Sequence, residues 1–158
     1  MSEEKKAIQA KAAFAAMCQM LDAEDWRYQK DEEKLIISCG ARGEDIPMDI
    51  TIKVDEGRQV ILLLSRLPFA AQENKRLDFA VAISAINHSI VDGSFDYDIK
   101  TGNVYFRMTN SYMDSSLSPK ACGYLLYCAC KTIDQYNDKL LMLAKGMISL
   151  EQFIAGMK

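Results

Sequence analysis

The chain has 158 residues, 49% of them hydrophobic and 26% charged, with a formal net charge of −3 and a pI near 5.2. These values are typical of a single globular domain, residues 1–158, that can bury a core without metal or disulfides. The acidic balance argues against general nucleic-acid binding and against attachment to anionic lipid, because both require a basic face.

Cysteine usage and the N-terminus indicate the compartment. The five cysteines are odd in number and lie in apolar, periodic segments, where a free thiol behaves as a small hydrophobic group. The start of the chain lacks the apolar core of a signal peptide, and no apolar run approaches the roughly 20 residues of a membrane span. We therefore expect a cytoplasmic protein with no membrane segment.

The first third of the chain predicts a helix followed by a hairpin. Residues 2–23 place apolar side chains three or four positions apart and are rich in Ala and Met, as in an amphipathic helix. Residues 26–31 and 35–40 are β-prone and flank an acidic turn, which predicts two paired strands.

Two further strands follow, with different patterns. Residues 48–55 alternate strictly between apolar and polar, which predicts a strand with one buried face. Residues 59–65 are apolar on both faces, as in a central strand. We expect the segment that contains Pro68 to end this strand, because proline cannot continue a central strand.

The second half predicts three helices and one more hairpin. Residues 72–91 read as a helix with a broad apolar face, and residues 93–108 as a hairpin. The expected apolar face comprises Leu77, Ala80, Val81, Ile83, Ser84, Ile86 and Ile90. Ser118 and Pro119 begin a long helix that Gly146 ends, and Ser149 opens a short last helix with a capping box in "SLEQ". The order α-β-β-β-β-α-β-β-α-α predicts an α+β fold, an antiparallel sheet with helices packed on it.

The hairpin sequence "GSFDYDIKTGNVYFR" raises the question of a charged site. Alternation places Asp96 and Asp98 on one side of the first strand, opposite its apolar residues. Joining the apolar rows of both strands requires odd-numbered residues to pair with even-numbered ones. We expect Tyr97 to face Phe106, and Asp96 to face Arg107 on the solvent side. An exposed ion pair of this kind needs no ligand, so we interpret these charges as scaffold.

No residue set in the sequence dictates a chemistry. His88 is the only histidine, and it has no recognisable nucleophile motif to serve. Cys128 and Cys130 lie two apart on a predicted helix, where their side chains diverge by about 200°. The glycines form no phosphate-binding loop. We therefore predict no catalytic, cofactor-binding or metal-binding residues, and a protein that is not an enzyme.

One apolar surplus does call for an explanation. One face of the strand at residues 59–65 packs on the protein's own helices, and the other still presents either Ile61 and Leu63 or the row Val60, Leu62 and Leu64. Tyr124 and Tyr127 similarly lie off the main apolar stripe of the long helix. Two interpretations remain open: a dimer or partner surface, or a row covered by the N-terminal helix. For the first, the candidate residues are Ile61, Leu63, Tyr124 and Tyr127.

Four stretches resemble the YbjN-like bacterial family, which is labelled a sensory transduction regulator. They are "AMCQMLDAEDWRYQKDEEKLIISC", "LLLSRLPF", "AISAINHSIVDGSFDYDIKTGNVYFR" and "LSPKACGYLLYCACKTIDQYNDKLLMLAKGMISLEQ". The resemblance runs from about Phe14 to Gly156, and its motifs (Trp26, Asn87 and the hairpin with Gly102) are structural. It implies a fold similar to type III secretion chaperones, small α+β proteins that dimerise and bind peptide segments of client proteins. It carries over no catalytic residues.

Together these observations predict a non-enzymatic, cytoplasmic chaperone-like adaptor or regulator. We expect it to act through protein contacts, as a homodimer, with a protein or peptide client. The alternative is a small-ligand sensor with a pocket between the sheet and the helices.

Overall fold

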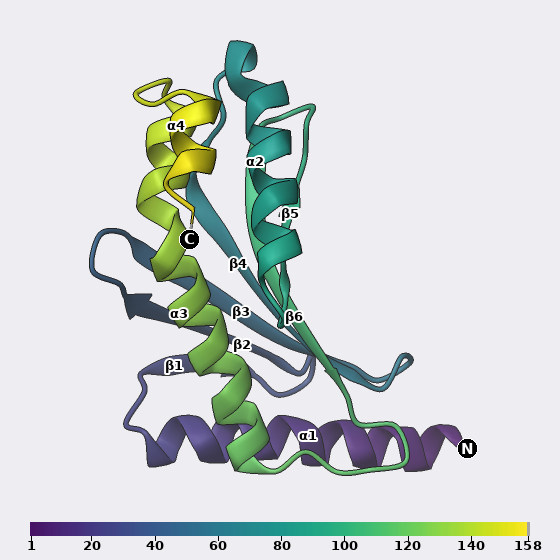
Figure 1. Cartoon of the computed structure of the whole chain (residues 1–158). Coiled ribbons are helices and arrows are strands. Elements are labelled where there is room, and N and C mark those ends of the chain that lie inside the picture. The colour runs from purple at the N-terminus through teal and green to yellow at the C-terminus, as the bar shows by residue number, and fades with distance from the viewer. Residues whose placement is uncertain (158) are drawn as a thin grey trace.

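The computed structural model of the protein describes residues 1–157 and has the predicted order of elements (Figure 1). The helices are α1 (Glu3–Ala23), the 3₁₀ turn η1 (Glu73–Lys75), α2 (Arg76–Ser89), α3 (Pro119–Ala144) and α4 (Leu150–Ala155). The strands are β1 (Tyr28–Asp31), β2 (Ile36–Arg42), β3 (Pro47–Asp55), β4 (Val60–Ala70), β5 (Ser94–Tyr97) and β6 (Asn103–Ser111). This is the predicted α+β fold.

The strands form one antiparallel sheet in the order β1-β2-β3-β4-β6-β5. The first four strands follow one another as a meander, and α2 separates β4 from its later partner. Helices α1, α2 and α3 pack against one face of the sheet, and α4 closes against α2 and α3 (Figure 1). The molecule therefore has two layers, with its core between the sheet and the helices.

The alternation of β3 shows how the sequence sets these layers. Met48, Ile50, Ile52 and Val54 are buried beneath the helices, whereas Asp49, Thr51 and Lys53 are exposed on the opposite face. In β6, Val104, Phe106 and Met108 repeat the pattern. The apolar stripe predicted for the long helix is likewise buried in α3: Cys122, Leu125, Leu126, Ala129, Ile133, Tyr136, Leu140 and Leu143.

The helix ends follow the predicted signals. Ser118 accepts a hydrogen bond from the backbone N–H of Ala121 at the start of α3. Ser149 and Gln152 form the expected capping box of α4. Gly146, just after α3, has a positive φ of 72°, which glycine adopts without strain.

Strand β4 is longer than predicted. It continues through Pro68 to Ala70, whereas we expected the segment that contains Pro68 to end it. Two features remove the conflict. Strand β3 pairs with β4 only as far as Leu64, so the later residues of β4 have no partner strand on that side. On the other side, the pairing of β4 with β6 shifts register between Arg66 and Ala70. Pro68 therefore lies where no ladder hydrogen bond needs its missing N–H.

Helix α2 buries only part of the predicted apolar face, Ile83 and Ile86. Phe79, Ala82, Ile83 and Ile86 point into the core, whereas Leu77 and Val81, which we expected inside, are exposed. The helix also begins later, at Arg76, after the η1 turn. Because this segment is apolar on more than one side, periodicity alone could not select the inner face.

In the β5–β6 hairpin, odd-numbered residues of one strand pair with even-numbered residues of the other, as predicted, but the individual pairs differ from those expected. Phe95 faces Phe106 and Tyr97 faces Val104, a shift of two residues from the expected pairs. The reason is Asp98, whose carboxylate accepts hydrogen bonds from the N–H of Lys100 and the hydroxyl of Thr101 and so starts the turn early. Asp96 and Arg107 still form an ion pair, now as diagonal neighbours, with 3.0 Å between Oδ2 and Nε.

Candidate functional site

We predicted no chemical role for His88 or the cysteines, and the structure places them as follows. His88 is exposed near the end of α2. All five cysteines are free, and burial raises the pKa of Cys39, Cys122 and Cys130 to about 11, which keeps these thiols protonated near neutral pH. Residues 1–157 contain no cluster of three or more His, Cys, Asp or Glu side chains suited to a metal ion, and no helix long and apolar enough to cross a membrane.

The structure overturns part of the predicted partner surface. Ile61 and Leu63 are 0% and 1% exposed and lie in the core beneath the helices. The β3–β4 turn decides this: Asp55 pairs with Val60, which places Val60, Leu62 and Leu64 on the polar face of the sheet. The sequence alone allows either Ile61 and Leu63, or Val60, Leu62 and Leu64, to face the core. The two residues that we predicted for a partner surface, Ile61 and Leu63, face the interior.

The open face of the sheet carries the apolar row instead. Leu62 lies between Lys53 and Thr109, and Leu64 between Thr51 and Arg107. These neighbours leave the row half-buried rather than fully exposed. Helix α1 does not cover it, because α1 packs against α3 and the opposite face of β3.

Tyr124 and Tyr127 are exposed on α3, at 55% and 64%. The hydroxyl of Tyr124 donates a hydrogen bond to Asp92, which raises the pKa of the phenol. The ring of Tyr127 lies 5.8 Å from the ammonium nitrogen of Lys131, a cation–π contact at the surface. These tyrosines lie on the helical layer and do not join the open-face row, so the predicted residues do not form one site.

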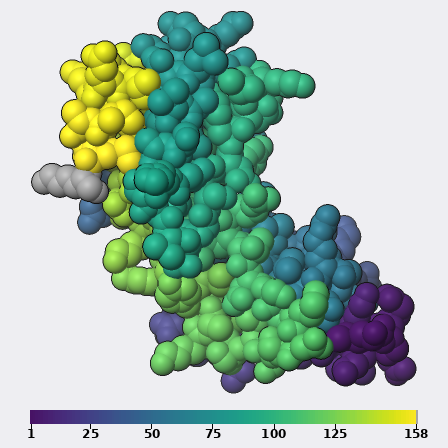
Figure 2. Space-filling view, turned by 45° about the vertical axis from the view of Figure 1, so that its right-hand side comes forward, coloured from purple at the N-terminus to yellow at the C-terminus, as the bar shows by residue number. Residues whose placement is uncertain are grey.

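A surface that sequence reasoning missed lies on the outward side of α2. Leu77 and Val81 are 74% and 52% exposed and lie one helical turn apart, directly opposite the buried face. No charged residue follows Asp78 in this helix, and Ser84 and His88 complete the exposed stripe. Figure 2 shows α2 (teal) open to solvent between α4 (yellow) and the β5–β6 hairpin (green).

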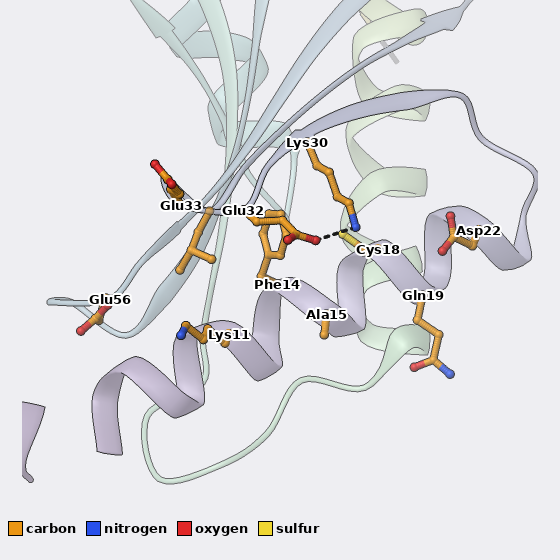
Figure 3. A pocket seen from close by; sticks show the side chains of 11 residues that line it. Lys11, Phe14, Ala15, Cys18, Gln19, Asp22, Lys30, Glu32, Glu33 and Glu56 are labelled. Atoms are coloured by element: carbon orange, nitrogen blue, oxygen red, sulfur yellow. Dashed lines mark ion pairs between the residues drawn. The ribbon is translucent and has the colours of Figure 1, made fainter. Parts of the chain in front are cut away.

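A hollow of about 860 Å³ lies between α1 and the β1–β2 hairpin (Figure 3). We call it the α1 groove. Phe14, Cys18 and Leu35 supply its apolar floor, and all three are nearly buried. The rest of its lining is Lys11, Ala15, Gln19 and Asp22 on α1, Lys30, Glu32 and Glu33 on the hairpin, and Glu56 on the β3–β4 turn.

Electrostatics divide the α1 groove into two ends. At one end Lys30 and Glu32 form an ion pair of 2.9 Å, which raises the pKa of Lys30, and the hydroxyl of Tyr28 donates to Asp22 at 2.8 Å. At the other end Glu33 and Glu56 have no cationic partner within salt-bridge distance among residues 1–157. Burial raises the pKa of the Cys18 thiol, which therefore behaves as an apolar part of the floor.

A second groove, about 540 Å³ in volume, lies between the end of α1 and the start of α3. Trp26, Met20, Leu126 and Tyr127 give it an aromatic and aliphatic lining, and Gly123 leaves space between the two helices. By contrast, the gap between α3 and the facing ends of β3 and β4 has no room for a water molecule. The space expected for a ligand pocket between the sheet and the helices is thus filled there.

Comparison with known proteins identifies the family to which this fold corresponds. The model of the YbjN family, described as "Putative bacterial sensory transduction regulator", matches residues 14–142. None of the curated protein sequences is significantly similar to this chain.

Two solved structures share the fold. One is the crystal structure of YbjN, "a putative transcription regulator from E. coli", with a TM-score of 0.59 at 14% sequence identity. The other is the ExsC–ExsE complex, with a TM-score of 0.55 and also 14% identity. Each alignment covers 80% of this chain and 92% of the other chain. The fold expected from the resemblance is confirmed.

Proposed function

The chain belongs to the YbjN family, and from this membership and its exposed apolar surfaces we propose that it is a non-enzymatic regulator or chaperone-like adaptor. It works in the cytoplasm through protein contacts, as a homodimer. The observation that carries this proposal is the outward face of α2.

The composition of that face favours a protein contact. Exposed helix faces in soluble proteins normally carry charge, yet Leu77, Val81 and Ser84 form an uncharged stripe over two turns. Burying an exposed Leu and Val contributes about 1.5–3 kcal/mol each relative to leaving them in water. A contact that covers the stripe therefore has a favourable hydrophobic contribution.

A second copy of the chain is the occupant we propose for this face. A two-fold contact brings the same patch together from both copies, so a patch without charge meets no like-charge repulsion there. Ala80 and Ser84 are small and allow two α2 helices to approach closely. The ExsC–ExsE structure, which shares the fold, is a complex of two proteins, in keeping with a fold that serves protein contacts.

Light scattering after size exclusion tests the proposal. We expect a mass of twice 17.8 kDa for the natural protein and a monomer for Leu77→Glu with an unchanged circular dichroism spectrum. Ile8→Glu is the matched control, because Ile8 is a similarly exposed apolar residue on α1, and it should remain dimeric. A monomeric natural protein at the highest soluble concentration would refute the dimer.

A further inference from the structure

We propose that the α1 groove binds a short extended segment of a partner protein, one that carries a large apolar side chain next to Lys or Arg. This inference rests on the proposed function, because it names the kind of partner that the adaptor contacts. It concerns a different surface from the outward face of α2.

The floor of the α1 groove fits one large apolar side chain. Phe14 and Cys18 lie one helical turn apart on α1 (Figure 3), and Leu35, in the turn just before β2, lines the same hollow. Ala15 lines the same wall and adds little bulk, which keeps the groove open between its longer neighbours Lys11 and Gln19. An apolar side chain that enters here meets aromatic, aliphatic and thiol surface.

The rim of the groove selects the charge of the partner. Asp22, Glu32, Glu33 and Glu56 contribute four negative charges, and Lys11 and Lys30 contribute two positive ones, so the lining has a net charge of −2 (−4 + 2). The Lys30–Glu32 pair is already formed. The carboxylates of Glu33 and Glu56 have no cationic partner among residues 1–157, and a Lys or Arg beside the apolar side chain would supply one.

The length of the groove favours a peptide. Its lining on α1 runs from Lys11 to Asp22, which is about 16 Å along the helix axis at 1.5 Å per residue. That distance equals about five residues of extended chain. Lys11, Ala15, Gln19 and Asp22, which line the groove along α1, are all exposed to solvent, as a chain that enters and leaves requires.

Selection from a phage-displayed library of random dodecapeptides tests the inference, because it requires no named partner. The library is selected on the natural protein and counter-selected on Ala15→Trp, which narrows the groove. We expect enriched peptides that carry Phe, Trp, Leu or Met within two positions of Lys or Arg. The same peptides, labelled with fluorescein, should bind Ala15→Trp about tenfold more weakly in fluorescence anisotropy. Ala12→Trp, on the same helix but outside the groove, should bind like the natural protein.

The charge requirement has its own variants. Glu33→Gln combined with Glu56→Gln should weaken binding of the selected peptides, and added salt should weaken binding to the natural protein more than to this variant. Glu44→Gln removes an exposed carboxylate elsewhere and should leave affinity unchanged.

Three results would overturn the inference: no enrichment that depends on an open groove, enrichment of acidic peptides, or equal affinity for Ala15→Trp. Mass measurements on the same samples separate the two proposals. A dimer that selects no peptide removes only the peptide site, whereas a monomer that binds basic, apolar peptides removes only the dimer.

Discussion

The side-chain amide of Asn87 pairs with the backbone of Phe95 as a neighbouring strand would. Its Nδ2 donates to the carbonyl oxygen of Phe95 at 2.9 Å, and its Oδ1 accepts from the N–H of Phe95 at 2.8 Å. Strand β5 is an edge strand, with β6 as its one neighbour in the sheet. Asn87 thus occupies backbone groups of this edge that would otherwise be free to pair with another chain.

Replacing Asn87 should destabilise the fold. Asn87→Ala removes both partly buried hydrogen bonds, each contributing about 1 kcal/mol, and leaves the groups of Phe95 unpaired. We expect a loss of about 2 kcal/mol in the free energy of unfolding, measured by urea denaturation. Asn87→Asp should be at least as harmful, because a second acceptor then faces the carbonyl of Phe95. Gln135→Ala, on the exposed side of α3, is the control and should have little effect.

Gly102 in the β5–β6 turn should not tolerate a side chain. Its φ is +77°, and a Cβ would overlap the carbonyl oxygen of Ala71, whose N–H donates to the carbonyl oxygen of Gly102 at 2.9 Å. Backbone strain and this overlap should make Gly102→Ala about 2–4 kcal/mol less stable. In Gly57→Ala the nearest atom is Oδ1 of Asp55 at 3.5 Å, an ordinary contact, so its melting temperature should stay near that of the natural protein. Similar losses for both variants would contradict this explanation.

Replacing the buried Asn137 with an apolar residue should stabilise the protein. Asn137 is fully buried on α3, and neither Oδ1 nor Nδ2 has a hydrogen-bond partner among residues 1–157. Asn137→Leu replaces these two polar atoms with methyl groups of similar size and should raise the free energy of unfolding by about 1–2 kcal/mol. Asn110→Leu, at a half-exposed position on β6, should change it little. A lower melting temperature for Asn137→Leu would show that the buried amide has partners in solution.

Two turn carboxylates predict a loss of stability in acid. The N–H of Lys100 and then the hydroxyl of Thr101 lower the pKa of Asp98, and the N–H of Arg58 lowers the pKa of Asp55, both from 3.8. Because the folded pKa values lie below the unfolded ones, the contribution is complete above about pH 4 and is lost as pH falls through the folded pKa values. The urea midpoint of the natural protein should therefore fall below pH 4.

The double variant Asp55→Asn and Asp98→Asn checks the origin of that loss. It retains an oxygen acceptor in each turn but has no carboxylate to protonate there, so its midpoint should depend less on pH in this range. Glu33→Gln combined with Glu44→Gln, at two exposed positions, matches this change of two in net charge. Identical pH profiles for the natural protein and the double variant would assign the acid sensitivity to other groups.

The elements whose order and ends could be predicted are those encoded locally. The alternation of residues 48–55 and the serine caps at Ser118 and Ser149 each depend on a few neighbours in sequence, and all were confirmed. The hairpin register depends on Asp98 competing for backbone N–H groups, and alternation does not report that competition. Strand β4 passes Pro68 because of where β3 stops, a fact that lies outside its own sequence.

The candidate surfaces also separate into features that local sequence predicts and features that depend on contacts between distant segments. The exposure of Tyr124 and Tyr127 followed from their position off the stripe of α3. Choosing Leu62 over Leu63 required knowing that Asp55 pairs with Val60. The α1 groove joins a helix, a hairpin and a distant turn, and its residues Glu32 and Glu33 read in the sequence only as a solvated turn. The long uncharged run of α2 after Asp78 was the one signal that could have revealed its outward face.

The strand order also constrains how the chain is made. Strand β4, with its central aliphatic run, leaves the ribosome as the last strand of a meander whose next neighbour, β6, lies beyond α2 and β5. Until Ser111 has emerged, one edge of β4 has no strand to pair with, and α3, which packs against β4, is synthesised later still. The interval between Ala70 and Ser111 is therefore the period of synthesis in which nascent chains are most exposed to aggregation through this edge.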